Sequence, residues 1–250
     1  MYRFKADWDR ALCANRKPFA NTGVAVSKSK DYHDYVFRDG KLVGEFEEMY
    51  RNSTTTPWHQ DEQNNWIDVR LTKEIIRDHG KYNEIHDLGC GTGHYLNLIA
   101  GDFLVQGGKS FGYDISETAC NRAKKNFPSS AFSVIDLTER SSKNYRQTDA
   151  AKPIPVRLFI VRGTLWYVYP KLAVVIDNIR NMMMATDRLL VVQNFPSLQS
   201  EFIGKDVLPN HSALVKHFSS SFDLHKHIWY ESTFSTSNDN WFIGIFSPRV

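Results

Sequence analysis

Three glycines at alternate positions follow an acidic residue in the segment DLGCGTG, residues 87–93. Residues 82–86 before it lead into a predicted strand, and residues 94–100 after it have apolar side chains at helical spacing. Glycine permits a sharp turn and lets a ligand approach the backbone, so this strand, turn and helix favour a nucleotide-like ligand. A dinucleotide fingerprint has the pattern GxGxxG, and His94 stands where its third glycine would be. The segment therefore predicts a cofactor other than NAD.

Two further acidic residues follow predicted strands at the spacing of a nucleotide-binding unit. Residues 109–113 read as a short strand before Asp114, and residues 131–135 as another before Asp136. Ser116 is a suitable N-cap for a helix that runs to residue 125. The Asp114 carboxylate can accept hydrogen bonds from both ribose hydroxyls. A single aspartate is common in caps and turns. Asp114 and Asp136, together with Asp87 at the start of the glycine turn, all stand at the ends of consecutive predicted strands, which favours ligand binding.

The glycine segment and these acids resemble the cofactor-binding motifs of the class I S-adenosylmethionine-dependent methyltransferases. The resemblance implies that the turn accommodates the methionine part of S-adenosylmethionine, that Asp114 binds the ribose and that Asp136 faces the adenine amino group. It also places a basic residue, Arg70, against the cofactor's carboxylate, with a solvated helix charge as the alternative. The cofactor-binding residues expected on this basis are Arg70, Asp87, Gly89, Cys90, Gly91, Gly93, Asp114, Ile115, Asp136, Leu137, Arg162 and Gly163.

From residue 82 onward, predicted strands and helices alternate, which is typical of a doubly wound sheet with helices on both faces. Further strands are expected at residues 156–161 and 188–194, and helices at residues 171–186 and 210–218. Residues 225–233 and 241–247 form an aromatic-rich closing pair around the polar turn STSNDN. This pair resembles the last two strands of class I methyltransferases. We therefore expect an α/β, Rossmann-like, seven-stranded sheet with an antiparallel last strand.

The N-terminal part is expected to form a lid. Asp39-Gly40 between two apolar runs in residues 35–46 predicts a hairpin, and residues 45–51 begin a helix-like segment. Residues 61–79 read as one long helix. The string FEEMYRNSTTTPWHQ resembles the opening of nodulation-type N-methyltransferases, although Thr56 stands where that group often has Asp. We expect residues 1–60 to be an extension and lid, and residues 61–250 to be the methyltransferase domain.

Methyl transfer depends on holding the acceptor close to the methyl group, so a pocket matters more than a catalytic triad. RGTLWY, residues 162–167, follows a predicted strand at the sheet edge where open α/β folds bind ligands. Trp166 and Tyr167 are expected to line the pocket beside the cofactor's sulfonium, with simple cover of the sheet edge as the alternative. Trp58, Trp166 and Tyr167 are therefore the candidate acceptor-binding residues.

His59, His211 and Tyr167 are the candidate catalytic residues, although each histidine is more often structural or superficial. His225 and His227 alternate on a predicted strand, but no third ligand stands at a useful spacing. No metal site is predicted.

The composition fits one α/β domain with an appended segment. The chain has 250 residues, 42% of them hydrophobic, and its formal net charge of +3 is too small to indicate nucleic-acid binding. Cys13, Cys90 and Cys120 lack CxxC spacing, which favours a reducing compartment and a cytoplasmic protein. No leader-like apolar region and no membrane-spanning run is seen, so no membrane attachment is expected.

These features predict methyl transfer from S-adenosylmethionine to an oxygen or nitrogen of a small polar molecule. A sugar, a nucleotide-linked sugar or a natural-product intermediate would fit. The chain lacks an Asn-Pro-Pro-Tyr motif after the strand at residues 156–161, which disfavours amide and base-amino methylation. The alternatives are a catalytically inactive S-adenosylmethionine-binding partner or regulator, and a protein methyltransferase.

Overall fold

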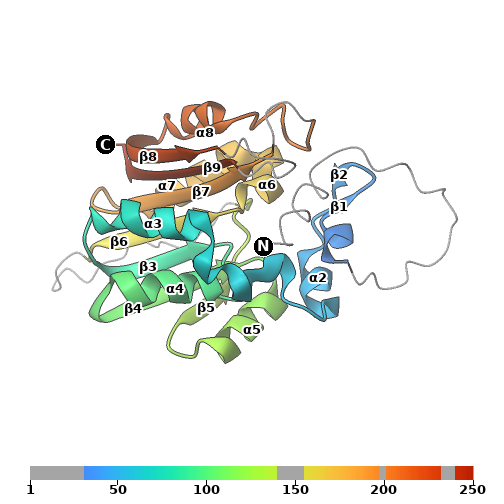
Figure 1. Ribbon diagram of the computed structural model, residues 1–250, viewed down its shortest axis with the longest axis horizontal. Helices are drawn as coiled ribbons and strands as arrows, with labels where there is room; N and C mark the ends of the chain where they lie inside the picture. Colours follow the sequence, from blue (N-terminus) through green and yellow to red (C-terminus); the bar gives the residue numbers. More distant parts are fainter. Residues whose placement is uncertain (1–30, 140–154, 197–200, 232–239, 250) are drawn as a thin grey trace, which may run out of the picture.

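A seven-stranded sheet runs through the computed structural model, which describes residues 31–139, 155–196, 201–231 and 240–249 (Figure 1). The strand order is β5-β4-β3-β6-β7-β9-β8. The strands are β3 (Tyr82–Leu88), β4 (Leu104–Asp114), β5 (Ala131–Val134), β6 (Arg157–Arg162), β7 (Arg188–Phe195), β8 (Phe222–Tyr230) and β9 (Asn240–Pro248). Neighbours pair in parallel except at β9, which is antiparallel to both β7 and β8. The expected Rossmann-like sheet with an antiparallel last strand is confirmed.

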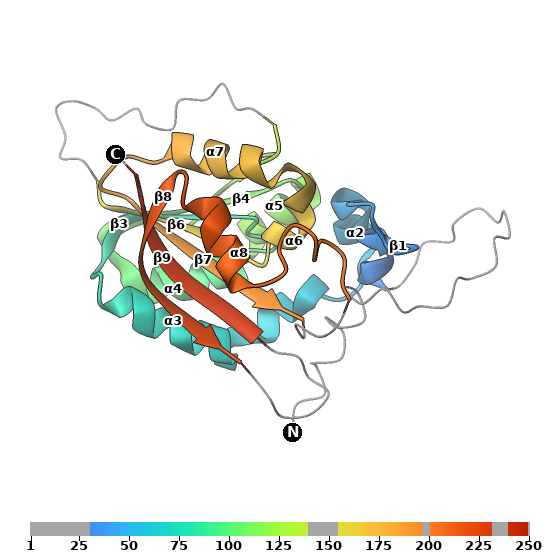
Figure 2. The ribbon, with the colours of Figure 1, turned by 90° about the horizontal axis from the view of Figure 1, so that it is seen from above.

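Helices cover both faces of this sheet, as Figure 2 shows. On one face lie α3 (Ile67–Arg77), α4 (His94–Phe103) and α5 (Glu117–Asn126), whose apolar side chains share a core with β3, β6 and β9. On the other lie α6 (Leu165–Val168), α7 (Leu172–Met182) and α8 (His211–Phe218). The central strand β7 is buried along almost its whole length, as expected for a strand covered on both faces.

The direction of strand addition reverses between β3 and β6, since β4 and β5 lie on one side of β3 and the later strands on the other. Such a switch point leaves a crevice beyond the carboxyl ends of the strands, where open α/β sheets bind ligands. The turn after β3 and the turn after β6 both open onto this crevice. The fold therefore places residues 87–93 and 162–167 side by side.

The described residues that precede α3 pack at this end of the sheet (Figure 1). Residues 31–66, which we call the N-terminal segment, contain η1 (Tyr32–Tyr35), β1 (Phe37–Arg38), β2 (Lys41–Leu42), α2 (Phe46–Asn52) and η2 (Pro57–Asn65). The predicted hairpin is confirmed: β1 pairs with β2 around Asp39 and Gly40, whose φ angles are 50° and 73°. Positive φ at both central residues is typical of the tight turns that suit hairpins.

The long helix expected at residues 61–79 is wrong. Trp66 has an extended backbone, with φ −66° and ψ 149°, and separates η2 from α3. Upstream of this break, Trp58 and His59 have φ angles of 54° and 50°, which few residues other than glycine adopt. This part of the chain lacks continuous helical hydrogen bonds. The side-chain hydrogen bonds described below hold it instead.

The other elements appear where the sequence predicted them, with shifted ends. The Ser116 side chain accepts a hydrogen bond from the Ala119 amide at 3.1 Å, which confirms it as the N-cap of α5. The proposed boundary at residue 60 falls within η2. Cys13 and residues 235–239 of the closing turn STSNDN lie outside the described residues, and Asn240 begins β9. No helix in the part of the chain that the structure describes is long and apolar enough to cross a membrane.

Candidate functional site

The glycine turn after β3 has no room for side chains at two of its positions. Gly89 has φ 90°, and a Cβ there would stand 2.3 Å from the Thr164 hydroxyl oxygen. Gly91 has φ 53°, and a Cβ there would stand 2.3 Å from the Gln60 amide nitrogen. The backbone amides of Gly89 and Cys90 donate to the Tyr113 carbonyl at 2.7 and 2.9 Å, which ties the turn to β4. Backbone therefore forms this wall of the crevice.

The acids after β4 and β5 lie beside this turn. The Asp114 carboxylate accepts from the Gly91 amide at 2.8 Å and from the Ser116 amide at 2.9 Å. Burial raises the pKa of Asp114, and these amide donors oppose that rise. Asp136 accepts from the Thr138 amide at 2.7 Å, and Ile115 between the two acids is 47% exposed. The arrangement offers carboxylate acceptors and an apolar side chain to one ligand.

A cavity of about 350 Å³ opens at this edge of the sheet, within the usual size range of small-molecule sites. The predicted cofactor residues that line it are Gly89, Asp114, Ile115, Asp136, Leu137, Arg162 and Gly163. Trp58 and Tyr167 of the predicted acceptor set line it as well. The structure thus brings residues from the ends of four strands and from the N-terminal segment to one cavity.

Arg162 is the cation among the described residues that line the cavity. Its Nε and one terminal nitrogen donate to one Asp68 carboxylate oxygen at 2.9 and 2.7 Å, and its other terminal nitrogen donates to the Gln63 side-chain oxygen at 2.5 Å. The guanidinium lies over the Tyr95 ring at 4.6 Å from its centroid. Burial disfavours the charge, but attraction to Asp68 raises the pKa of Arg162. A fixed positive charge therefore faces the cavity.

Some predicted cofactor residues do not reach the cavity. Cys90, Gly91 and Gly93 shape the turn without lining the cavity, and Asp87 lies buried beneath the turn, where burial raises its pKa to about 7. Arg70 is exposed on α3 and lies outside the cavity lining. Successive helical residues point about 100° apart, so α3 turns Asp68 towards the sheet and Arg70 away from it.

Trp166 does not line the cavity, in contrast to the expectation that it walls the sulfonium. Its side chain is 0% exposed, and its ring packs edge-on against Phe195 and Phe202. Its indole nitrogen donates to the Asn194 carbonyl at 3.1 Å. Neighbouring residues of α6 point in different directions, so Tyr167 faces the cavity while Trp166 faces the core.

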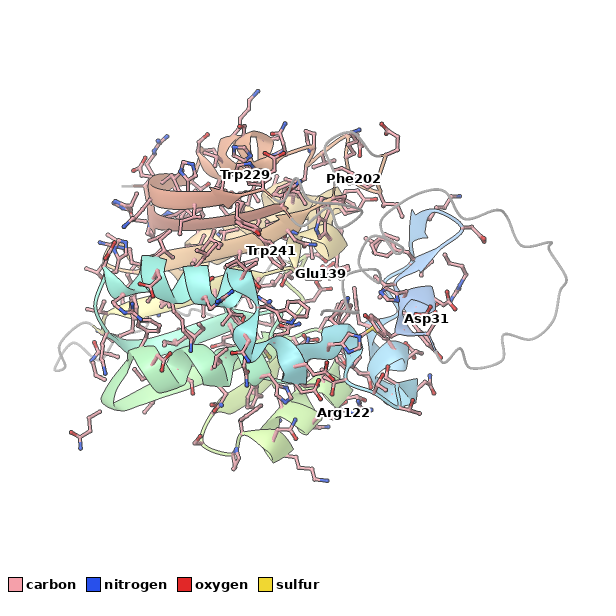
Figure 3. The ribbon with its side chains drawn as sticks, viewed as in Figure 1. Asp31, Arg122, Glu139, Phe202, Trp229 and Trp241 are labelled. Atoms are coloured by element: carbon pink, nitrogen blue, oxygen red, sulfur yellow. The ribbon has the colours of Figure 1, made fainter. Side chains whose placement is uncertain are left out.

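The two candidate catalytic histidines also lie outside the cavity lining. His59 is 4.0 Å from the Glu62 carboxylate and 26% exposed. His211 stacks on Trp229, labelled in Figure 3, at 4.1 Å between ring centroids. Burial lowers the pKa of His211. Neither histidine is placed to remove a proton from a molecule in the cavity in this conformation.

The N-terminal segment is fastened to the glycine turn and to α5. The Gln60 side-chain oxygen accepts from the Thr92 amide at 2.8 Å and from its hydroxyl at 2.7 Å. The Glu47 carboxylate accepts from the Ser116 hydroxyl at 2.6 Å and from the Thr118 amide at 3.1 Å. Glu47 thus lies at the N-terminus of α5, where a helix favours negative charge.

Arg122 of α5 provides a third attachment of the N-terminal segment, after Gln60 and Glu47. Arg122, which Figure 3 labels below α2, donates to the Tyr50 carbonyl at 2.5 Å.

Burial raises the pKa of Glu47, but the bonds from Ser116 and Thr118 hold it at about 2. The carboxylate is therefore ionised at neutral pH.

Sequence reasoning missed several residues of the cavity. Tyr50, Gln60, Gln63 and Asn194 line it, and Asp68 holds Arg162 from behind. Asn194 could have been found, because it ends the predicted strand at residues 188–194 on the ligand edge. Gln63 falls inside the helix predicted at residues 61–79, and Gln60 directly precedes it, so neither glutamine indicated a role in the site.

The sequence comparisons agree with this geometry. A family model described as a methyltransferase domain matches residues 79–241, which include the glycine turn, both acids and β6. The chain belongs to this family, the class I S-adenosylmethionine-dependent methyltransferases. No curated protein is detectably similar to it in sequence.

Solved structures share the fold of this methyltransferase. The N-methyltransferase NodS from Bradyrhizobium japonicum, solved with S-adenosyl-L-homocysteine, has a TM-score of 0.58 at 11% identity, over 79% of this chain and 94% of that chain. A second solved structure is described as the conversion of a disulfide bond into a thioacetal group during echinomycin biosynthesis. Its TM-score is 0.57 at 16% identity, over 81% of this chain and 90% of that chain. The [4+2]-cyclase SpnF has a TM-score of 0.54 at 11% identity, over 73% of this chain and 81% of that chain.

The cavity fits the cofactor of the family, S-adenosylmethionine. Gly89 leaves bare backbone in the cavity wall, and Gly91 lets the turn behind that wall pack against Gln60, where a Cβ would collide. Asp114 and Asp136 offer acceptors for hydroxyl and amino groups, and Arg162 offers donors for a carboxylate. S-adenosylmethionine carries such groups: hydroxyls on its ribose, an amino group on its adenine and a carboxylate on its methionine part.

Proposed function

We propose that this methyltransferase transfers the methyl group of S-adenosylmethionine to an oxygen or nitrogen of a small molecule. The observation that carries the proposal is that one cavity is lined both by the residues expected to bind the cofactor and by Trp58 and Tyr167. When bound, S-adenosylmethionine supplies an activated methyl group. The cavity is enclosed partly by the N-terminal segment, so it suits an acceptor of small size.

The residues of the chain would act by binding and orientation. Asp114 and Asp136 would receive the ribose hydroxyls and the adenine amino group, and Arg162 would receive the carboxylate. The acceptor's lone pair forms the bond to the methyl carbon as the carbon–sulfur bond breaks. The electron pair stays on sulfur and the acceptor's proton passes to water. Holding the acceptor close and aligned then accounts for much of the acceleration.

The first experiment measures cofactor binding by titration calorimetry with S-adenosyl-L-homocysteine. Asp114→Ala should weaken binding about 10- to 150-fold, the range for losing a hydrogen bond to a charged group. Asp223→Ala is the control, because Asp223 is an exposed acid paired with Arg249 on the surface. An equal dissociation constant in a folded Asp114→Ala variant would remove Asp114 from the site.

The second experiment asks where the methyl group goes. The protein is incubated with methyl-labelled S-adenosylmethionine and a cell extract separated into small molecules, protein and nucleic acid. Label in the small-molecule fraction is the expected result. Label in the protein fraction would identify a protein methyltransferase, and no label with intact cofactor binding would identify an inactive binding module.

A further inference from the structure

The cavity has a charged end and an uncharged end. Its charged lining residues, among those the structure describes, are Asp114, Asp136 and Arg162. All three belong to the set proposed for the cofactor. The described lining residues outside that set carry no charge, and no histidine is among them. The space left for the acceptor is therefore bounded by neutral side chains.

Aromatic rings from three elements meet at this uncharged end. Phe46 of α2 and Tyr167 of α6 lie 5.3 Å apart between ring centroids, and Trp58 of η2 lies 5.6 Å from Tyr167. Tyr50 lies 6.2 Å from Trp58. Leu42 of β2 also lines this end. The four rings form what we call the aromatic wall.

This wall discriminates between acceptor types by physical chemistry. Flat rings gain from edge and face contacts with aromatic side chains in addition to the area they bury. A carboxylate there would lose its hydration without gaining a partner of opposite charge, and an ammonium group would gain only contacts with ring faces, which offset little of the hydration it loses. A polyol would leave most of its hydroxyls facing carbon. The wall therefore favours an uncharged, flat ring.

The ionisable groups of the wall do not provide a base. Burial raises the pKa of Tyr50 and of Tyr167 well above the usual range, so both hydroxyls stay protonated at neutral pH. They can donate or accept hydrogen bonds, but they do not take up a proton. An acceptor whose nucleophilic atom reacts without help from a protein base suits this site.

We propose that the acceptor is an uncharged small molecule with a flat aromatic ring, which binds against Phe46, Trp58 and Tyr167. The proposal rests on the methyltransferase function proposed above. It narrows the acceptor from the sugars and related polar molecules that the sequence suggested to neutral aromatic compounds whose nucleophilic atom needs no deprotonation before transfer, such as aromatic amines.

The test uses protein saturated with S-adenosyl-L-homocysteine and measures the binding of four small probes by ligand-observed NMR. The probes are indole, methyl α-glucoside, benzoate and benzylammonium. Indole should bind roughly tenfold more tightly than each of the others, because only indole is both flat and uncharged. Stronger binding of the glucoside, binding of benzoate or benzylammonium as tight as that of indole, or no binding of indole would overturn the proposal.

Two variants connect the result to the wall. Phe46→Ala should weaken indole binding roughly tenfold and leave the affinity for S-adenosyl-L-homocysteine unchanged. Leu42→Ala serves the same purpose if the first variant does not fold. Val134→Ala is the matched control, since Val134 is a 48% exposed valine of β5 outside the cavity lining. Unchanged indole binding in the folded wall variants would place the probe elsewhere and overturn the proposal.

The two proposals fail in different ways. Protein that does not bind S-adenosyl-L-homocysteine contradicts the proposed function, and the probes are then tested on the protein alone. Protein that binds S-adenosyl-L-homocysteine but not indole keeps the methyltransferase function and loses the aromatic acceptor.

Discussion

Neutral substitutions in the buried pair Arg162–Asp68 should affect the stability of this protein and its cofactor affinity differently. In Arg162→Gln, the Asp68 carboxylate stays in a site that is 0% exposed and loses its guanidinium partner. Removing one partner of a buried ion pair usually costs about 3–5 kcal/mol of unfolding free energy. The double variant Arg162→Gln/Asp68→Asn leaves no unpaired charge, so it should recover much of that loss.

Cofactor affinity should not recover with stability. Three N–H groups of Arg162 bind Asp68 and Gln63, so part of the five-donor guanidinium is left for a ligand carboxylate. Losing one charge-assisted bond should cost about 1.5–3 kcal/mol, or about 10- to 150-fold in affinity for S-adenosyl-L-homocysteine. The affinity for 5′-methylthioadenosine should not change, because that molecule has no carboxylate. Calorimetric titration of both ligands, together with urea unfolding, measures all these quantities.

The chain contains a matched control at the other end of the same strand. Arg157 begins β6 and pairs with Asp187 at 2.5 Å, with side-chain exposures of 5% and 0%. Arg157→Gln/Asp187→Asn should change stability in the same way but leave both ligand affinities intact. Unchanged affinity for S-adenosyl-L-homocysteine in the Arg162 double variant would refute the assignment of Arg162. An equal loss for 5′-methylthioadenosine would show that the cavity itself had been distorted.

Four further substitutions test the packing of the protein around the site. The pKa of Glu47 is about 2 against a usual 4.5, so its contribution is present above pH 4.5 and is lost as pH falls towards 2. Glu47→Gln should therefore cost about 1–2 kcal/mol of unfolding free energy at pH 7, and urea unfolding should show the difference shrinking below pH 4.5. Gly80→Ala, with φ 84° and open space around it, should cost about 1–2 kcal/mol. Gly89→Ala, with φ 90° and the Thr164 contact, should cost clearly more by the same measurement; equal losses would contradict the close packing of the turn. Trp166→Ala should cost about 3–5 kcal/mol without weakening S-adenosyl-L-homocysteine binding, whereas weakened binding would return Trp166 to the cavity.

The cofactor side of the site was predictable because its residues are fixed by short-range rules. A glycine that follows a strand and precedes a helix must lie at the sheet edge, and an aspartate that ends the next strand must lie beside it. Gly89, Asp114 and Asp136 follow from this reasoning alone. The order of strands and helices also follows from hydrophobic periodicity, since each element has its own apolar pattern.

The other side of the site depends on long-range contacts that no local pattern reveals. Trp58 and His59 have left-handed backbone conformations, which the sequence does not indicate because neither residue is a glycine. Arg162 and Asp68 are 94 positions apart, and their pairing is settled by the packing of α3 on the sheet. The sequence predicted Arg70 of the same helix, because it stands where related methyltransferases often have a basic residue, but the direction of its side chain takes it away from the cavity.

The attachment of the N-terminal segment affects the cost of opening the cavity. Glu47 fastens it to α5 on one side of the crevice and Gln60 fastens it to the glycine turn on the other. Moving this segment away from the crevice would break these bonds, so their free energy adds to the cost of opening the cavity on this side.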